Sequence, residues 1–145
     1  MGDTLRRVSA DIEKGRALLP LITLRHPFRP CVLAALASAL YYRFILSRQE
    51  HDLLSLIPLL TEALLLPLGP AAVQFFHTTR MFYKLTCSLA FRFELRRNSE
   101  DVEHALKYYR YILTMSPRAL GEIDTQEVAD NLTRLLAYKI GRAHV

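Results

Sequence analysis

The sequence predicts an all-α fold, a right-handed α-solenoid of antiparallel helix pairs with about six helices. The prediction rests on an internal repeat, on the helical spacing inside that repeat, and on its period. A nine-residue pattern begins at Leu36, returns at Leu85 and returns again at Leu132. Five positions agree in type across the three copies: Leu36/Leu85/Leu132, Leu40/Leu89/Leu136, Tyr42/Phe91/Tyr138, Arg43/Arg92/Lys139 and Phe44/Phe93/Ile140.

The spacing and the period both indicate paired helices. Large apolar residues recur every four positions, which places them on one helical face and does not fit the two-residue alternation of a strand. The copies start 49 residues apart, from Leu36 to Leu85, and then 47 residues apart, from Leu85 to Leu132. Periods in this range are typical of stacked two-helix units, each of which buries its apolar face against its neighbours.

The first element is predicted to be a single helix over residues 3–19. Leu5, Val8, Ile12 and Leu19 recur near helical spacing before Pro20. We interpret residues 1–20 as a partial repeat, the second helix of a pair whose first helix is missing. Residues 21–30 contain two prolines and are predicted to be a loop.

The first complete repeat is predicted over residues 30–67. Pro30 suits a helix start, so the first helix is expected over residues 31–48. The second helix, over residues 52–66, is apolar nearly all round, as expected of a helix covered on more than one side. Pro58 lies inside it and is expected to kink it.

The second complete repeat is predicted over residues 70–117. Its first helix runs over 71–97, long enough to be two segments, and its second helix over 100–115. Asn98 and Ser99 supply a helix cap, and the following acidic residues suit the positive end of the helix dipole. The apolar stripe of the second helix comprises Val102, Ala105, Leu106, Tyr109, Ile112 and Leu113.

The third copy lies in a partial repeat over residues 124–139. Residues 140–145, Ile-Gly-Arg-Ala-His-Val, correspond to the codons ATC GGA AGA GCA CAC GTC, which match the start of a common sequencing-library adapter. We therefore interpret 140–145 as a non-native tail and 1–139 as one helical-repeat domain, a fragment of a longer array. Uncapped ends of such an array are expected to self-associate.

Composition favours a folded chain on the cytoplasmic side of the membrane. The 145 residues are 51% hydrophobic, which is ample for a core, and the first residues do not resemble a signal peptide. The apolar runs 31–46 and 53–66 fall short of the roughly 20 residues that span a bilayer, and they contain Arg43 and Glu62, so no membrane span is expected. A net charge of +5 suits acidic partners, but it is spread along the chain, which makes nucleic acid a weak candidate.

No residue set specifies a reaction, so the chain is predicted not to be an enzyme. The five histidines lack the i, i+4 spacing of a helical zinc site, and we expect no metal and no cofactor. There is no glycine-rich phosphate loop and no Gly-x-Ser-x-Gly motif. Cys31 and Cys87 lie in apolar helical pattern and are predicted to be buried thiols.

The paired helices resemble the tetratricopeptide repeat. That family places a small residue, an aromatic residue, another small residue and a terminal proline at steps matched here by Ala105, Tyr109, Ile112 and Pro117, although Ile112 is not small. The first-helix pattern, preceded by His26-Pro27-x-Arg29-Pro30, is similar to the longer tetratricopeptide-like repeats of large fungal proteins. The resemblance covers roughly residues 25–139 and implies a protein-binding scaffold, with armadillo- or HEAT-type repeats as the alternative helical solenoid.

The functional hypothesis is a groove, lined by the first helix of each repeat, that binds a peptide or helix of a partner protein. Partner-binding residues are predicted to be Tyr42, Arg43, Phe91, Arg92 and Arg96, the arginines pairing with carboxylates of an acidic segment. An alternative for Arg43 and Arg92 is structural, since both lie near helix ends where they can satisfy carbonyls and the helix dipole. The alternative function is a nucleic-acid-binding helical repeat module.

Overall fold

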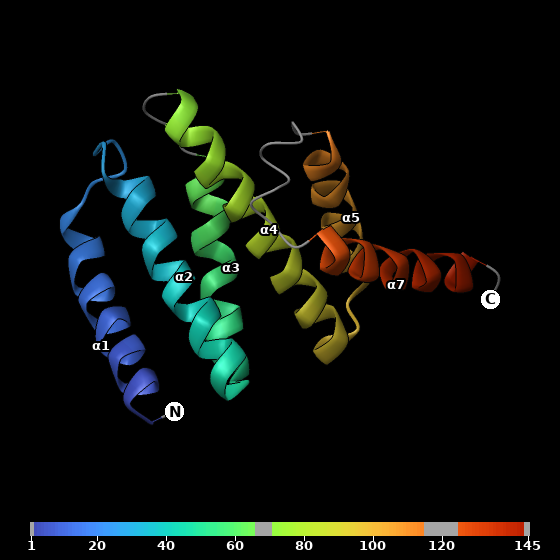
Figure 1. Ribbon diagram of the computed structural model, residues 1–145, viewed down its shortest axis with the longest axis horizontal. Coiled ribbons are helices and arrows are strands. Elements are labelled where there is room, and N and C mark those ends of the chain that lie inside the picture. Colours follow the sequence, from blue (N-terminus) through green and yellow to red (C-terminus); the bar gives the residue numbers. More distant parts are fainter. Residues whose placement is uncertain (1, 66–70, 115–124, 144–145) are drawn as a thin grey trace. The chain divides into compact units, whose positions relative to one another are not determined.

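The computed structural model describes residues 2–65, 71–114 and 125–143, with side chains described outside 71–79, 125 and 142–143. Within these ranges the chain forms six α-helices and one 3-10 helix, and no strand (Figure 1). Their bounds are α1 Gly2–Leu18, η1 Leu19–Leu21, α2 Arg29–Ser47, α3 Glu50–Leu65, α4 Ala71–Arg96, α5 Ser99–Leu113 and α7 Thr125–Ala143. The all-α prediction is therefore confirmed, and α4 is one helix and not two segments.

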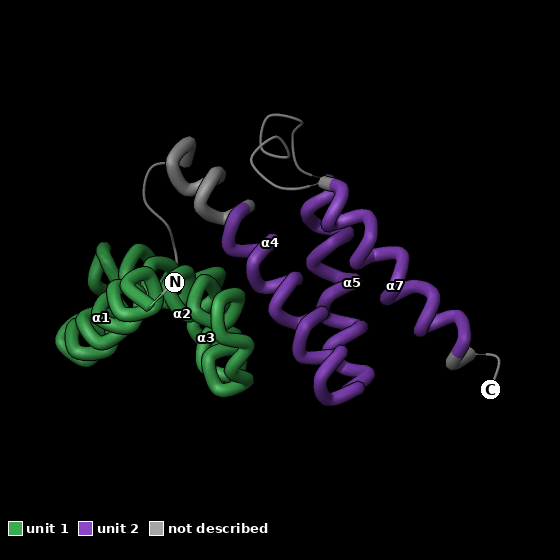
Figure 2. Tube along the Cα trace, turned by 60° about the horizontal axis from the view of Figure 1, so that its bottom comes forward, with its two compact units in different colours: residues 1–71 green, residues 72–145 purple. Residues whose placement is uncertain are grey.

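The helices belong to two compact units, Met1–Ala71 and Ala72–Val145, coloured separately in Figure 2. Unit 1 holds α1, η1, α2 and α3, and unit 2 holds α4, α5 and α7. The division falls close to Gly69-Pro70, where the sequence predicts the boundary between repeats.

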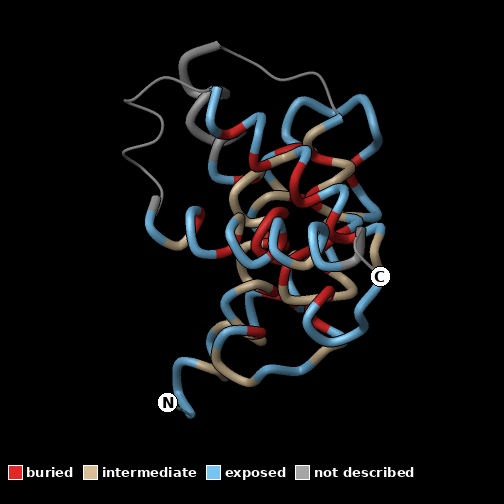
Figure 3. Tube along the Cα trace, turned by 90° about the vertical axis from the view of Figure 1, so that its right-hand side faces the viewer, coloured by how far each residue is buried: buried red, intermediate tan, exposed pale blue. Residues whose placement is uncertain are grey.

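In unit 1, α2 packs against both α1 and α3. The core consists of one apolar face from each helix. Figure 3 marks the buried positions of the described chain in red. The largest contributors are Ile12, Leu33, Leu36, Leu40, Phe44, Leu53, Leu56 and Leu60. Gly15 lets α1 approach closely, because a Cβ there would lie 3.0 Å from a methyl carbon of Leu36.

Helix α2 differs from the sequence-based expectations in two respects. Cys31, predicted to be buried, is exposed, because it lies on the first turn outside the packed face. By length and composition alone, α2 could cross a membrane, although 33% of its apolar window is buried inside the structure. The apolar run 31–46 is shorter than this helix, because α2 also includes Arg29, Pro30 and Ser47.

In unit 2, α5 presents the apolar stripe that the sequence predicts, with one exception. Val102, Ala105, Leu106, Tyr109 and Ile112 are buried, whereas Leu113 at the end of the helix is exposed. α7 packs against α5, and the buried residues among its described side chains are Val128, Asn131 and Leu135.

The pairs α2/α3 and α4/α5 are two copies of one helical hairpin. Every buried residue of α3 has a buried counterpart in α5 exactly one period, 49 residues, further on: Asp52/Asp101, Leu53/Val102, Leu56/Ala105, Ile57/Leu106, Leu60/Tyr109 and Ala63/Ile112. Each hairpin is closed by a two-residue connection, Arg48-Gln49 or Arg97-Asn98. The arginine of each connection has a left-handed backbone with φ of 57°. Its N–H donates to the carbonyl of Phe44 or Phe93 at 2.7 Å, an arrangement that ends the helix.

A buried ion pair ties the two helices of each hairpin together. Arg43 donates from Nη2 and Nε to the Asp52 carboxylate at 2.6 and 2.9 Å, and Arg92 donates from Nη2 to Asp101 at 2.7 Å. The carboxylates are 0% and 1% exposed, so each would be an uncompensated buried charge without its arginine. The hydrogen bonding that Arg43 donates to the Asp52 carboxylate raises the pKa of Arg43, despite the opposing effect of burial.

A polar cluster lies inside unit 2, where α4, α5 and α7 meet. Tyr83 donates to the Glu127 carboxylate, and the Cys87 thiol lies 3.9 Å from the other oxygen of the same carboxylate. The Tyr109 hydroxyl is buried next to Asn131 and Cys87, but it makes no hydrogen bond of good geometry with a described residue. Burial, and secondarily the neighbouring Cys87, raises the pKa of Tyr109.

We expect Arg92→Ala to destabilise the chain by about 3–5 kcal/mol, because it leaves the Asp101 carboxylate buried and unpaired. The double variant Arg92→Met/Asp101→Leu should recover most of this loss, since it removes both charges and keeps apolar volume. Urea unfolding followed by circular dichroism measures both. Arg110→Ala, an exposed arginine of α5, is the control and should change stability by less than about 0.5 kcal/mol. If Arg92→Ala and the control Arg110→Ala lowered the free energy of unfolding by similar amounts, the structural role of the Arg92–Asp101 pair would be contradicted.

We expect Tyr109→Phe to stabilise the chain by up to about 1 kcal/mol at neutral pH, because it removes a buried hydroxyl whose contacts with Asn131 and Cys87 have poor hydrogen-bond geometry. Since burial raises the folded-state pKa, the hydroxyl stays neutral in the folded chain while the unfolded chain ionises above about pH 10. As pH rises above about 10, the free energy of unfolding of the wild type should therefore fall more than that of Tyr109→Phe, so that the advantage of the variant grows. A loss of stability in the variant at neutral pH would show that the hydroxyl is well bonded.

Candidate functional site

The predicted partner-binding arginines Arg43 and Arg92 are turned into the hairpins. Each guanidinium donates to the aspartate of the following helix, Asp52 or Asp101, and Arg43 also contacts Ser9 at 3.3 Å. Their structural role differs from the helix capping that the sequence suggested, because the acceptor is a carboxylate of the next helix. While these pairs are formed, neither arginine offers its full guanidinium to a partner.

The other predicted residues lie at different places on the two units. Tyr42 lies on α2 and is 48% exposed, and Arg96 is exposed on the last turn of α4. Phe91 is half-buried on α4, on a side of the helix that approaches α7. Of the five, Phe91 lines one of the two hollows described below and the other four line neither, so the candidate site is built mainly from other side chains.

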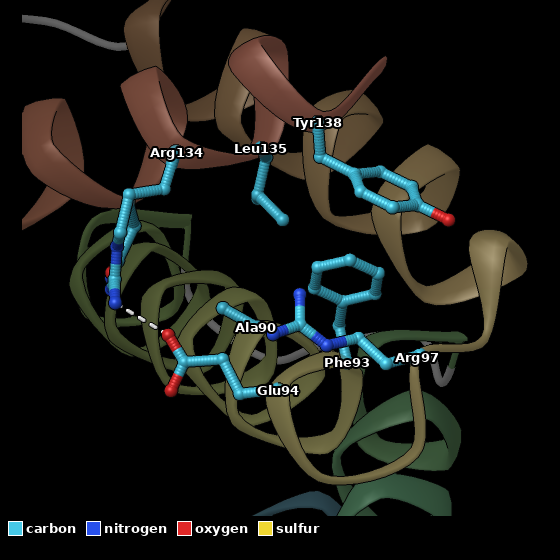
Figure 4. Close-up of a pocket in the computed structure, with 8 residues that line it drawn as sticks. Ala90, Phe93, Glu94, Arg97, Arg134, Leu135 and Tyr138 are labelled. Atoms are coloured by element: carbon cyan, nitrogen blue, oxygen red, sulfur yellow. Dashed lines mark hydrogen bonds and ion pairs between the residues drawn. The ribbon is translucent and has the colours of Figure 1, made fainter. Parts of the chain in front are cut away.

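A hollow of about 300 Å³ lies between α4 and α7, and Figure 4 shows its lining. Side chains of α4 form one wall and side chains of α7 form the other. The lining residues are Ala90, Phe93, Glu94 and Arg97 from α4, and Asn131, Arg134, Leu135 and Tyr138 from α7. The hollow belongs entirely to unit 2.

The floor of this hollow is apolar and aromatic. Ala90, Phe93 and Leu135 are buried residues whose side chains reach the hollow from below its rim. The rings of Phe93 and Tyr138 meet edge to face with centroids 4.5 Å apart, a favourable arrangement for an aromatic pair. Such a surface suits an aliphatic or aromatic side chain of a ligand.

The rim carries two arginines in different electrostatic situations. Arg134 forms an ion pair with Glu94 across the hollow and also donates to Asn131. Arg97 lies over the Phe93 ring, 5.2 Å from its centroid, and no described carboxylate pairs with it (Figure 4). Arg97 is therefore the positive charge that this rim can offer to an anionic group.

A second, more open hollow of about 520 Å³ continues along the same two helices. Its lining residues are Phe91, Gln126, Glu127, Asp130, Asn131 and Arg134. Because Asn131 and Arg134 line both hollows, the two are adjacent, and together they are named the α4–α7 groove. Sequence reasoning missed Arg97 and Arg134, although Arg97 and Arg48 stand one period of 49 residues apart, which was an available signal.

The groove offers no built site for a metal ion. Among the residues that the structure describes, no three His, Cys, Asp or Glu side chains gather closely enough to hold one. The groove contains an apolar floor, a cation and mixed polar groups, and these favour recognition of a side chain over chemistry on it.

Comparison with known proteins adds no family to this description. No protein-family model matches the chain, and no curated protein and no solved structure is significantly similar to it.

Proposed function

We propose that this chain is a non-enzymatic protein–protein interaction scaffold whose α4–α7 groove binds a peptide or helix of a partner protein. The observation that carries the proposal is the hollow between α4 and α7, with its apolar floor and, at its rim, Arg97, which pairs with no carboxylate of the described residues. Concave apolar surfaces with a few directed polar groups are typical of ligand sites.

The architecture that we propose for the scaffold is a right-handed, tetratricopeptide-like α-solenoid. Two observations support it: the hairpins α2/α3 and α4/α5 match residue for residue over one period, and α7 carries the third copy of the first-helix pattern. In this architecture α4 and α7 are successive first helices, so the groove between them corresponds to the surface that helical repeats use for binding.

The groove chemistry favours an acidic segment with a large apolar residue. An aliphatic or aromatic side chain fits the floor formed by Phe93, Leu135 and Tyr138, and a neighbouring carboxylate can pair with Arg97. The net charge of +5 favours the same class of partner. We propose that this recognition takes place in the cytoplasm and without a membrane span.

A nucleic-acid-binding role is less well supported by the groove. A polyanion that followed it would meet Glu94, Glu127 and Asp130 as well as Arg97 and Arg134. Nucleic-acid surfaces instead gather basic residues on one face, where they can neutralise successive phosphates.

Selection of a random peptide display library on the intact chain tests this proposal. We expect enrichment of peptides in which Asp or Glu stands beside Leu, Ile or Phe. Arg97→Glu should weaken the selected peptides by about tenfold or more, because a charge-assisted contact is replaced by repulsion. Fluorescence anisotropy measures the affinity.

Arg110→Glu is the matched control, because Arg110 is exposed on α5 and does not line the groove. Circular dichroism should show unchanged helicity in both variants. Equal weakening by the two variants would place the binding surface elsewhere. Oligonucleotide binding whose affinity falls steeply with salt would favour the nucleic-acid alternative.

A further inference from the structure

The connection between α1 and α2 exposes large apolar side chains although its backbone is held in place. This connection, residues 19–28, comprises η1 and the turns that follow it, and it is named the α1–α2 loop. Leu21, Leu24 and Phe28 are 79%, 63% and 65% exposed, and Leu18 at the end of α1 is 45% exposed. Large apolar side chains gathered on one short exposed segment indicate an interaction surface.

The loop is anchored to unit 1 from inside. Ile22 is buried, and Arg29 at the start of α2 donates from Nη1 to the Ile22 carbonyl at 2.6 Å. Arg29 also donates from Nε and Nη2 to Glu62 of α3 at 3.2 and 2.9 Å, so the loop lies at the end of unit 1 where α1 ends, α2 begins and α3 ends (Figure 1). Further backbone hydrogen bonds close turns within the loop. The apolar side chains are therefore presented by an ordered frame, which lowers the entropy lost on binding.

The charge around the loop is biased toward cations. Over residues 14–49 the sequence contains no Asp or Glu. Arg25 is exposed in the middle of the loop and forms no ion pair with a carboxylate in the part of the chain that the structure describes. Arg16, on the last turn of α1, has only an exposed and distant partner, Glu13 at 3.8 Å. On the side of α3, the charge of Glu62 is offset by its ion pair with an arginine.

This combination favours an anionic membrane surface over a protein as the cover of the loop. A protein that buried Leu24 and Phe28 would also take Arg25 out of water, and a buried guanidinium without a carboxylate is strongly unfavourable. An anionic bilayer offers phosphate groups at the level where the head of a long basic side chain lies when its neighbours are inserted. Fluid acyl chains also accept protruding apolar side chains without a preformed pocket.

We propose that the α1–α2 loop docks on the surface of an anionic lipid bilayer. Leu21, Leu24 and Phe28 enter the boundary between headgroups and acyl chains. Arg25 pairs with lipid phosphates beside them. Docking involves one leaflet and no span, because α2 stays packed against α1 and α3. The loop belongs to unit 1, so the proposal does not depend on the function proposed for the α4–α7 groove in unit 2.

Flotation of the intact chain with lipid vesicles tests the proposal. We expect binding to vesicles of phosphatidylcholine with phosphatidylserine, weakening as salt rises, and little binding to phosphatidylcholine alone. Leu24→Asp should weaken binding by about tenfold or more, because it replaces an inserted apolar side chain with a charge that the surface repels. Arg25→Glu should weaken it by about tenfold, because it reverses the charge that meets the lipid phosphates.

A tryptophan at Phe28 reports on the depth of the loop. The chain contains no tryptophan, so Phe28→Trp introduces a single fluorophore. Its emission should shift to shorter wavelength on addition of the anionic vesicles, and lipids brominated in the acyl chains should quench it. Leu95→Trp is the control, because Leu95 is 55% exposed on α4 in unit 2 and should show neither effect.

Leu95→Asp and Arg110→Glu match Leu24→Asp and Arg25→Glu in charge change and exposure, and both should affect vesicle binding far less. Circular dichroism checks that every variant stays helical. Absence of vesicle binding, equal binding to phosphatidylcholine alone, or binding that Leu24→Asp and Arg25→Glu leave intact would overturn the proposal. Self-association that Leu24→Asp abolishes, in a chain that does not bind vesicles, would assign the loop to a second copy and would also overturn it.

Discussion

The carboxylate buried in each hairpin constrains the rest of the structure. A lone ionised aspartate inside a protein costs several kcal/mol, so Asp52 and Asp101 can be buried only where an arginine meets them with good geometry. That requirement fixes how far α3 can slide along α2 and how far α5 can slide along α4. Once the pair is in place, the apolar faces of the two helices are also in register, which is why every buried position of α3 recurs in α5.

The same constraint explains where the groove forms. Arg92 directs one side of α4 toward α5, and the left-handed backbone of Arg97 ends α4 immediately before the turn into α5. Ala90, Phe93 and Glu94 remain on a side of α4 that α7 can approach, and the hollow lies between them. Arg97 therefore has two roles: its backbone conformation makes the turn between α4 and α5, and its guanidinium is the cation at the rim that pairs with no described carboxylate.

The sequence predicted the helices closely, but it did not predict which side chains line the α4–α7 groove. Pro30 and Asn98 located helix starts to within two residues, and the helical spacing identified five of the six residues assigned to the stripe of α5. The repeat singled out Arg43 and Arg92 correctly as equivalent, but it could not show which way they point. A signal was present, because Asp52 and Asp101 share the same offset of 49 residues; a conserved offset between opposite charges indicates an internal pair. Arg134 had no such signal, since its place at the hollow depends on how α7 packs in unit 2.

The two-residue connections have a consequence for how the chain folds. A loop this short costs little closure entropy, and the contacts across each hairpin join residues close in sequence, so the hairpins should form early and quickly. The aspartate stays hydrated until its helix meets the preceding one and then loses its water together with the arginine. Each hairpin is thus expected to form in a single cooperative step. An intermediate in which the second helix is only half docked, with its carboxylate already dehydrated but not yet paired, is too high in free energy to be populated.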